Sequence, residues 1–382
     1  MNRRPALFAL VAALALGLAA CGSSSSSTPS STTVGKASAA SATTLGGANN
    51  LITPSEQLNG SGANSIEPFF TKVFYTYTKL NPKVTINYQP SGSSVGISDI
   101  QQNIVDFGDS EIPMSSSDLA KATGGPILQV PVDLGGVAIS YNVPGIPHGL
   151  KLDGPVLAGI FMGTIKDWDD SQIASLNPGV HLPSVPIVPV HRADSSGPGW
   201  VLDQYLITTS PTWAATVGTK ASKSWPLPSV GVGEQLNTGV ANYIAQTSGA
   251  VGYVEYGYAK QANFANAAIK NRAGVYLAPS ITGISAAGAN ATNLSPTNFS
   301  IVYGPGAATY PLANFSWTLI YQKQASTTKG EVLGKVFDWV TTAGQLQAAA
   351  LGYAPLPSNV RTLAHQTLLQ LESTSGQRIF TQ

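Results

Sequence analysis

Residues 187–206, IVPVHRADSSGPGWVLDQYL, contain the pattern of a strand, a tight turn and a helix in that order. The apolar run 187–190 is followed by HRAD, then by the turn sequence SSGPG, and then by the amphipathic segment 200–207. A turn of this kind directs backbone N–H groups outward at the N-terminus of a helix, where they can bind an anion. The stretch therefore predicts an anion site at the start of this helix.

The polar residues of the stretch also suit oxyanion recognition. Arg192 can direct two N–H bonds at one oxyanion, and Asp194 stands two residues later, where it can hold the guanidinium. Ser196 can donate through its hydroxyl and its backbone N–H, and Pro198 suits the first position of a helix, where a missing N–H costs little. The alternative is a capped surface helix with a solvated Arg192–Asp194 pair, and this stretch alone leaves both interpretations open.

Two further turns rich in Gly and Ser precede helical segments. LNGSGANSIEPFF (58–70) leads into a run with apolar residues at helical spacing over 66–80. YQPSGSSVGISDI (88–100) follows the alternating strand pattern VTINY (84–88). Three such turns, all with hydroxyl donors, indicate that the turns converge on one anion.

A cluster of carboxylates accompanies these donor-rich turns. The segment VDFGDSEIP (105–113) carries Asp106, Asp109 and Glu111. A carboxylate beside an anion is favourable only when the ligand carries a proton that the carboxylate can accept. The cluster therefore favours hydrogen phosphate over sulfate.

Length and composition narrow the class of protein. A chain of 382 residues favours two domains, and only 10% of the residues are charged, with 20 Lys and Arg against 19 Asp and Glu. This balance does not suit nucleic-acid binding. Strand patterns at 127–132 and 137–141 alternate with helical patterns at 240–246 and 331–341, which favours an α/β fold. The four histidines are scattered, so no metal and no cofactor is expected.

The N-terminus predicts export and lipidation. Two arginines precede the apolar run 6–20, which is shorter than the roughly 20 residues that a membrane-spanning helix needs, so residues 1–20 are typical of a signal peptide. The run ends in LAAC, which resembles a lipobox with Cys21 as the lipidated residue; the alternative is an ordinary signal peptide with a chance cysteine. Residues 21–50 are rich in Ser, Thr, Gly and Ala and predict a flexible tether. We therefore expect a protein anchored to the cell membrane and facing the periplasm or the cell exterior.

The order and spacing of eight segments resemble those of the phosphate-binding proteins (PstS type) of phosphate ABC transporters, a family of type II periplasmic binding proteins. The segments are LNGSGAN, NYQPSGSSVGI, VDFGDSEIP, DLGGVAISYNVPG, MGTIKDWDDSQIASLNPGVHLP, VHRADSSG, SGAVGYVEYGYAKQ and TYPLANFSWTLI. The resemblance covers about residues 58–371, which is nearly all of the chain after the tether.

The resemblance implies two α/β domains with the ligand in the cleft between them and two crossing strands as the hinge. Residues 51–130 and 311–382 are expected to form the first domain, and 131–310 the second. The implied function is capture of inorganic phosphate and its delivery to an ABC permease, by a monomer that is not an enzyme. The implied phosphate contacts are Asn64, Ser65, Ser93, Glu111, Arg192, Ser196, Gly197 and Pro198, with Asp194 orienting the arginine.

Three of these residues depart from the pattern of the family. Asn64 and Pro198 stand where threonine is usual, and Glu111 stands where aspartate is usual. The Asn64 amide can still donate, but proline supplies neither a hydroxyl nor an N–H, so at least one donor is lost. The same fold could therefore bind another oxyanion, such as sulfate, molybdate or a phosphonate.

Two other functions remain as alternatives. The first is a secreted phosphoester hydrolase with Ser196 as nucleophile and His191 nearby, although SSGPG does not match the G-x-S-x-G pattern. The second is a signalling or adhesion lipoprotein that keeps the fold without the transport function.

Overall fold

The computed structural model describes residues 55–381 except 293, 296, 297 and 299. Cys21, the predicted signal peptide and the predicted tether lie outside the described residues. Among the helices of the described part, none has the length and apolar character that crossing a membrane requires.

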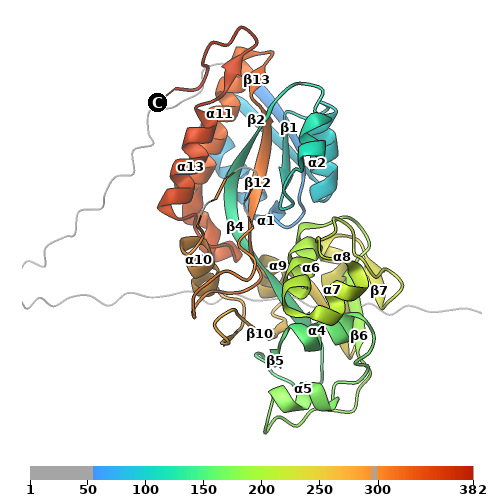
Figure 1. Ribbon diagram of the computed structural model, residues 1–382. Helices are drawn as coiled ribbons and strands as arrows, with labels where there is room; N and C mark the ends of the chain where they lie inside the picture. The colour runs from blue at the N-terminus through green and yellow to red at the C-terminus, as the bar shows by residue number, and fades with distance from the viewer. Residues whose placement is uncertain (1–54, 293, 296–297, 299, 382) are drawn as a thin grey trace, which may run out of the picture. The chain divides into compact units, whose positions relative to one another are not determined.

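The first lobe is built on parallel strands that end at the predicted anion site. Strand β1 (Glu56–Gly62) pairs with β2 (Val84–Pro90) on one side and with β3 (Phe107–Ser110) on the other. Strand β12 (Ala313–Tyr321) lies antiparallel between β3 and the first part of β4 (Ile127–Tyr141). The helices of this lobe are α1 (Glu67–Leu80), α2 (Ser93–Gln101), α3 (Ser116–Ala120), α11 (Thr327–Thr341), α12 (Ala348–Leu351) and α13 (Ser358–Leu368), with the 3-10 turn η1 (Ala343–Gln347) and the short pair β13 (Lys323–Gln324) and β14 (Glu372–Ser373) (Figure 1).

The second lobe continues the same sheet through β4. The second part of β4 pairs antiparallel with β8 (Ala250–Glu255), and β6 (Val188–Arg192) and β7 (Val232–Glu234) follow in parallel. The helices of this lobe are α4 (Gly154–Phe161), α5 (Ser171–Leu176), α6 (Gly197–Thr209), α7 (Pro211–Val217), α8 (Leu236–Gln246) and α9 (Tyr256–Gln261). Helix α10 (Ile281–Ala289) packs against β4 and β12 and lies beside α13 in Figure 1. The remaining strands are β5 (Lys151–Leu152), β9 (Ala265–Asn266), β10 (Ala268–Lys270) and β11 (Tyr276–Leu277).

Strand β4 joins the two lobes without a break. Gly136 faces Ala313 of β12, whereas the next residue, Val137, faces Glu255 of β8. The stretches 127–132 and 137–141, predicted as strands, are both strand, and they form one continuous strand because the residues between them keep the extended pairing with β12. A Cβ atom at Gly135 would lie 2.4 Å from Oε1 of Glu255, so a larger residue at this crossing would displace the Glu255 carboxylate. The domain boundaries predicted near 130 and 311 remain a prediction.

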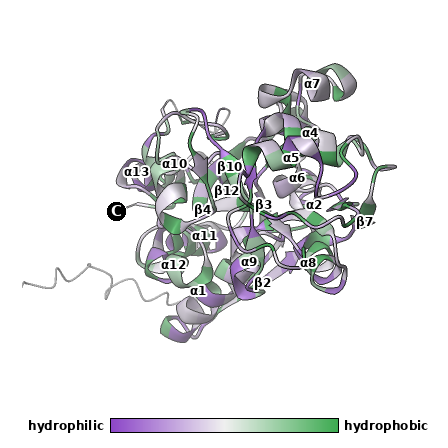
Figure 2. Cartoon of the chain, turned by 90° about the horizontal axis from the view of Figure 1, so that it is seen from below, coloured by the Kyte–Doolittle hydropathy of each residue, from purple (hydrophilic) through white to green (hydrophobic). Residues whose placement is uncertain are grey.

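Apolar periodicity correctly located the main helices and strands. The helix predicted over 66–80 is α1, whose buried face carries Phe69, Phe70 and Phe74 and packs against Phe107 and Phe337. The predicted strands at 84–88 and 187–190 are β2 and β6, and the predicted helices at 240–246 and 331–341 are α8 and α11. Figure 2 shows hydrophobic and hydrophilic stretches on the same helices, as amphipathic packing requires.

Helix α6 begins slightly earlier than the pattern predicted. Its N-cap is Ser196 and its first residue is Gly197, so Pro198 occupies the second helical position and not the first. Both positions lie in the first turn, where the backbone N–H of a helix has no partner within the helix. The proline therefore fits the helix without loss of an internal hydrogen bond.

Candidate functional site

The turn between β6 and α6 is held by short-range hydrogen bonds. The Ser196 side chain accepts from the Gly199 N–H at 3.1 Å, which is an N-cap, and its own N–H donates to the Lys223 carbonyl at 3.2 Å. The backbone N–H of Ser196 is therefore engaged within the protein, whereas its hydroxyl hydrogen is not used by the cap. Of the two donors expected from this residue, the hydroxyl is the one that remains for a ligand.

Arg192 ends β6 and is almost fully buried, at 2% exposure. Its Nε donates to Oδ1 of Asp194 at 2.6 Å, and a second nitrogen donates to Oδ2 of the same carboxylate. Asp194 also accepts from the Leu236 N–H at 3.0 Å, at the start of α8. This bidentate contact uses two of the five N–H groups of the guanidinium and fixes the plane of the others.

Glu111 approaches Arg192 from the first lobe. It follows β3 directly and is 2% exposed. Its Oε1 accepts from Nδ2 of Asn314, whereas Oε2 is buried and has no hydrogen-bond partner among the described residues. A Cβ atom at Gly197 would lie 2.0 Å from this Oε2, so the carboxylate rests against the first turn of α6. The free oxygen of Glu111 thus lies directly against the N-terminus of α6.

Burial dominates the titration of Glu111. It raises the pKa of this carboxyl from an ordinary 4.5 to about 7, although the nearby Ser65 hydroxyl, the Asn314 amide and the Arg192 guanidinium all lower it. The Ser65 hydroxyl acts from close range without the geometry of a hydrogen bond, and its oxygen is another buried atom without a partner. Glu111 therefore exchanges a proton close to neutral pH.

Three other buried carboxylates lie behind Glu111 along the sheet. Burial also raises the pKa of Asp109, Asp133 and Glu255 well above the ordinary values, and repulsion between the carboxylates adds to the shift. Asp109 accepts from the hydroxyls of Ser316 and Thr318, and Glu255 accepts from the Gly136 N–H at 2.8 Å. Burial in the interior of the sheet therefore favours the protonated form of these carboxyls, because a bare charge is costly there.

Asn64 connects the two lobes through its side chain. Its Nδ2 donates to Oε2 of Glu67 at 2.7 Å and to the Tyr258 hydroxyl at 3.1 Å, while its Oδ1 accepts from the Asn237 N–H at 2.8 Å. The Tyr258 hydroxyl in turn donates to the Asn64 carbonyl at 3.0 Å. The amide hydrogens expected to reach the ligand are therefore engaged within the protein, and a phosphate contact from Asn64 remains a prediction.

Other contacts close the cleft around these groups. Oγ of Ser94, in the first turn of α2, lies 2.5 Å from Oγ of Ser195, and Lys223 forms an ion pair of 2.6 Å with Asp118 of α3. Ser93 accepts from the Glu111 N–H at 3.4 Å, which places this predicted contact beside the carboxylate. The structure thus brings Ser65, Ser93, Glu111, Arg192, Ser196, Gly197 and Pro198 to one cleft between α1, α2 and α6.

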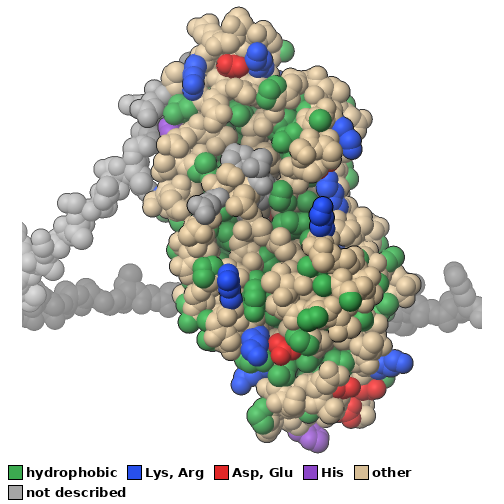
Figure 3. Space-filling model, viewed as in Figure 1, with side chains coloured by type: hydrophobic (Ala, Val, Ile, Leu, Met, Phe, Trp, Pro, Cys, Tyr) green, Lys and Arg blue, Asp and Glu red, His purple; other side chains and the backbone are tan. Residues whose placement is uncertain are grey.

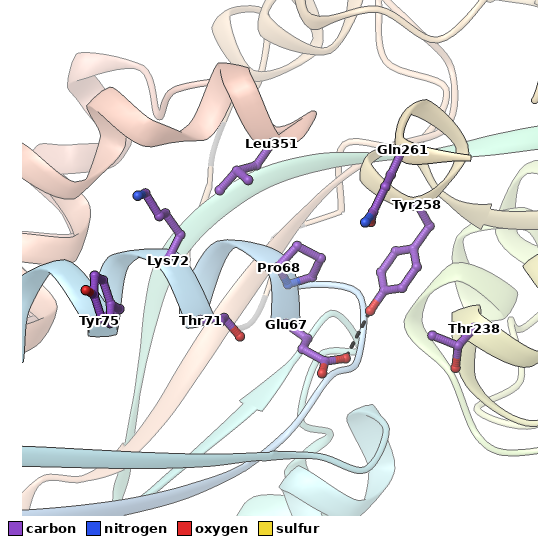
Figure 4. A pocket seen from close by; sticks show the side chains of 9 residues that line it. All are labelled: Glu67, Pro68, Thr71, Lys72, Tyr75, Thr238, Tyr258, Gln261 and Leu351. Atoms are coloured by element: carbon purple, nitrogen blue, oxygen red, sulfur yellow. Dashed lines mark hydrogen bonds between the residues drawn. The ribbon is translucent and has the colours of Figure 1, made fainter. Parts of the chain in front are cut away.

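An open hollow of about 650 Å³ lies beside this cleft. Figure 4 shows it between α1 and α9, with the hydrogen bond from Tyr258 to Glu67 at its floor. The lining residues are Glu67, Pro68, Thr71, Lys72, Tyr75, Thr238, Tyr258, Gln261 and Leu351. The hollow is flanked by elements of both lobes, and it does not include Arg192 or Glu111.

The geometry does not fit a serine hydrolase. His191 is buried, its Nδ1 is 3.1 Å from the Arg192 carbonyl oxygen, and its ring stacks on Trp225 with 5.9 Å between centroids. Ser196 accepts from a helix N–H, and no hydrogen bond of the described residues joins it to His191. Within the same part of the chain, no three His, Cys, Asp or Glu residues are grouped as metal ligands.

Sequence reasoning missed three residues that complete the cleft. Asn314, Asn237 and Tyr258 contact Glu111 or Asn64 from positions far along the chain. Asn314 lies within the segment TYPLANFSWTLI, where a polar residue at the start of an apolar strand was an available signal. Asn237 and Tyr258 carry no comparable signal in the sequence.

The fold and a cleft of this kind define a class of proteins that bind a small solute between two lobes. Residues 26–343 match the PBP superfamily domain. The phosphate-binding protein PstS of Xylella fastidiosa is 38% identical over 311 residues, which cover 81% of this chain and 84% of that protein. The chain belongs to the PstS family of phosphate-binding proteins.

Solved structures show the same fold. A high affinity periplasmic phosphate-binding protein, PfluDING, bound with phosphate, has a TM-score of 0.64 at 22% identity and covers 81% of this chain and 93% of its own. A putative phosphate ABC transporter substrate-binding protein from Clostridium perfringens, also with bound phosphate, has a TM-score of 0.57 at 15% identity and covers 79% and 100%. The predicted α/β fold with two domains of the type II binding-protein architecture is confirmed.

Proposed function

We propose that this chain binds one inorganic phosphate in the cleft between Arg192 and Glu111 and delivers it to the permease of an ABC importer. Membership of the PstS family supports the ligand, and the substrate-binding protein from Clostridium perfringens supports the transporter. The observation that carries the proposal is the buried, unpartnered Oε2 of Glu111, which faces the first turn of α6 and lies in the field of Arg192.

The two groups act on different parts of the ligand. The N–H groups of Arg192 that Asp194 does not use donate to the phosphate oxygens, and the hydroxyls of Ser65, Ser93 and Ser196 add neutral donors. Oε2 of Glu111 accepts the hydrogen bond from the protonated oxygen of hydrogen phosphate. Sulfate has no proton at neutral pH, so it meets a buried like charge without a compensating bond.

Closure of the cleft accompanies binding. The contacts of Ser94 with Ser195 and of Asn64 with Asn237 and Tyr258 join the two lobes around the anion. A ligand held by both lobes stabilises the form in which these contacts exist, which the permease can then distinguish from an open form. The chain performs no chemical step in this scheme, since Ser196 caps a helix and His191 does not reach it.

The protein works outside the cytoplasm, attached to the membrane through lipid on Cys21. The LAAC sequence and the polar residues after it support this part of the proposal. Cys21→Ser is expected to release the protein from the membrane fraction, whereas unchanged fractionation would contradict the anchor. A single acyl chain gives only marginal attachment, so more than one chain is expected.

Calorimetry on the purified chain in detergent, with phosphate, arsenate, sulfate and a phosphonate, tests the ligand. The expected result is tight binding of one phosphate per chain and weak or no binding of sulfate. Equal affinity for sulfate and phosphate would exclude Glu111 as the filter, and a phosphonate bound more tightly than phosphate would assign the site to that ligand. A chromogenic phosphoester incubated with the protein gives no product if the chain is only a binding protein.

The charge distribution favours phosphate over a nucleic acid as partner. Figure 3 shows the Lys and Arg residues of one face spread over it, some of them beside Asp or Glu, without a continuous basic surface. A nucleic-acid surface instead gathers such residues along one face to neutralise several phosphates. The cation that matters is the buried Arg192, which is accessible only to a small anion inside the cleft.

A further inference from the structure

Asn314 lies at the point where the two lobes share strands. It is the second residue of β12, faces Gly135 of β4 in the sheet register, and is 4% exposed. The next residue pair toward the second lobe, Ala313 and Gly136, is the last before β4 changes partner from β12 to β8. The side chain of Asn314 therefore belongs to the crossing strands and, through Glu111, also to the cleft.

Only one end of the Asn314 side-chain amide has a hydrogen-bond partner among the described residues. Its Nδ2 donates to Oε1 of Glu111, but its Oδ1 is buried and has no hydrogen-bond partner among the residues described. A buried acceptor without a partner destabilises a fold. The Asn314 amide therefore stabilises the fold less than an amide with both ends hydrogen-bonded. Fold stability alone does not explain its single bond to the Glu111 carboxylate.

Asn271 shows what a purely structural asparagine does in the same protein. It is 1% exposed, its Nδ2 lies within 3.3 Å of three backbone carbonyls, and its Oδ1 accepts from the N–H groups of Ala273 and Val275. Both ends of this amide are satisfied by the backbone. The contrast indicates that Asn314 serves Glu111 and not the local backbone.

The bond makes the two oxygens of Glu111 different. Oε1 is held at β12, and this leaves Oε2 against Gly197 in the first turn of α6. The glutamate side chain has three rotatable bonds, so it needs a restraint to present one oxygen at a fixed place. An amide supplies the restraint without a positive charge that would compete with the ligand for Arg192.

We propose that Asn314 is a positioning residue that fixes Oε2 of Glu111 as the acceptor of the ligand's proton and so sets the preference for hydrogen phosphate. The inference rests on the proposed function of the cleft. The charged and titratable groups that face Glu111 are Arg192 of β6, Asp109 of β3, Asp133 of β4, Glu255 of β8, Tyr88 of β2 and Tyr353 after α12. None of these groups donates a hydrogen bond to Oε1, whereas the Asn314 amide does.

The test compares Asn314→Ala with wild type by calorimetry of phosphate and of sulfate on the full chain. The phosphate affinity is expected to fall about fivefold to tenfold, whereas the sulfate affinity is not expected to fall, since sulfate makes no bond to Oε2. The midpoint of the pH dependence of phosphate binding is expected to move to higher pH, because the Asn314 amide lowers the pKa of Glu111. An equal loss for both anions, or an unmoved midpoint, would overturn the inference.

A double variant distinguishes positioning from a direct contact. In the Glu111→Gln background, Asn314→Ala is expected to cause no further change in the phosphate-to-sulfate ratio, because the residue acts through Glu111. The same loss in both backgrounds would assign Asn314 an independent role. Asn314→Ser, whose hydroxyl is too short to reach Oε1, should reproduce the change in the ratio and keeps the test informative if the alanine variant folds poorly.

The control variant is Asn271→Ala. It is expected to lower the melting temperature while leaving the phosphate-to-sulfate ratio and the pH midpoint at their wild-type values. A change in the ratio in this control, as large as that of Asn314→Ala, would show that any buried asparagine has this effect and would overturn the inference. Absence of phosphate binding in the wild type itself would instead overturn the proposed function of the cleft, together with the inference that rests on it.

Discussion

The two walls of the cleft differ in how their buried charged groups are paired. On the second lobe, the cation Arg192 is paired in advance with Asp194, which is itself held by the Leu236 N–H. On the first lobe, Glu111 keeps one buried oxygen without a partner and has other buried carboxylates behind it. One wall is therefore fixed in charge and geometry before a ligand arrives, and the other changes its protonation near neutral pH.

Because of this difference, we expect the wall with Arg192 to determine how tightly an oxyanion binds and the wall with Glu111 to determine which oxyanion is preferred. A guanidinium remains charged at any physiological pH, and its bidentate partner fixes its plane, so the second wall attracts any small oxyanion. A carboxylate with a raised pKa discriminates by whether the ligand brings a proton. The comparison predicts that variants of the two walls differ in kind: changes near Arg192 affect all oxyanions, and changes near Glu111 affect the choice among them.

The largest expected effect comes from Arg192→Ala. The variant leaves Asp194 without its partner, and loss of one member of a buried pair costs about 3–5 kcal/mol of folding free energy. Affinity for phosphate and sulfate is expected to fall at least tenfold, or about 1.4 kcal/mol. Urea unfolding and calorimetry measure the two losses.

Arg192→Lys is the matched control for this change. It keeps the charge but not the fork, so it should retain the fold and lose affinity for both anions without changing their ratio. Unchanged phosphate affinity in a folded Arg192→Ala protein would place the binding site elsewhere.

The next largest effect is expected from Glu111→Gln, which changes how the free energy of unfolding depends on pH. Burial raises the pKa of Glu111 from 4.5 to about 7, so between these values the folded state holds more protons than the unfolded state. The free energy of unfolding of the wild type without ligand therefore falls as pH rises through this window, by about 3 kcal/mol from this group at about 1.36 kcal/mol per unit. Above pH 7 the contribution is constant.

Glu111→Gln should remove this part of the slope and make the protein more stable than wild type at pH 8. The slope from Asp109, Asp133 and Glu255 has the same sign and should persist. Urea unfolding at pH 5, 6, 7 and 8 measures the difference. Parallel curves for the two proteins would show that Glu111 does not titrate in this range.

A smaller effect is expected from Asp194→Asn. The amide keeps one acceptor for Arg192 but loses the charge and the second bond, so the guanidinium gains freedom. Phosphate affinity should fall between threefold and tenfold with no change in the phosphate-to-sulfate ratio, since a hydrogen bond to a charged group is worth about 1.5–3 kcal/mol and part of it remains. An increase in affinity would mean that the negative charge of Asp194 repels the ligand more than it orients Arg192.

The smallest expected effect is that of Tyr258→Phe, which leaves both walls intact and removes only a link between the lobes. The hydroxyl bonds with Asn64 and with Glu67, as Figure 4 shows for the second. Net loss of about 1 kcal/mol corresponds to roughly fivefold weaker phosphate binding. Stopped-flow measurement should find the change in the dissociation rate, and Tyr276→Phe, away from the cleft, should match the wild type.

Features that depend on residues close together in the chain could be predicted from the sequence. The spacing of apolar residues located α1, α8 and α11, and the Gly- and Ser-rich turn after β6 indicated the start of α6. Arg192 and Asp194 stand two residues apart, so their contact follows from the local chain geometry. The expectation that Glu111 lies close to Arg192 and Asp194 came from the resemblance to a family and not from the residues near Glu111 in the sequence.

The parts that escaped prediction depend on residues far apart in the chain. Asn64 and Tyr258 are 194 positions apart, and Glu111 and Asn314 are 203 apart. Periodicity reports which face of an element is buried, and it carries no information on which polar side chain meets which across a cleft. The unbroken course of β4 escaped for a related reason, since its polar and glycine residues in the middle interrupt the apolar pattern while the sheet pairing continues.

The place of β12 in the sheet has a consequence for how the protein forms. This strand lies between β3 and β4, yet it follows all strands of the second lobe's sheet in the chain. During synthesis, β3 and the first half of β4 therefore lack their common neighbour until residue 321 has been added, and only then can the first sheet close. Contacts between such distant segments slow folding. Until β12 has paired, the edges of β3 and β4 that it covers are exposed, and unpaired strand edges of this kind can bind a chaperone or a second chain.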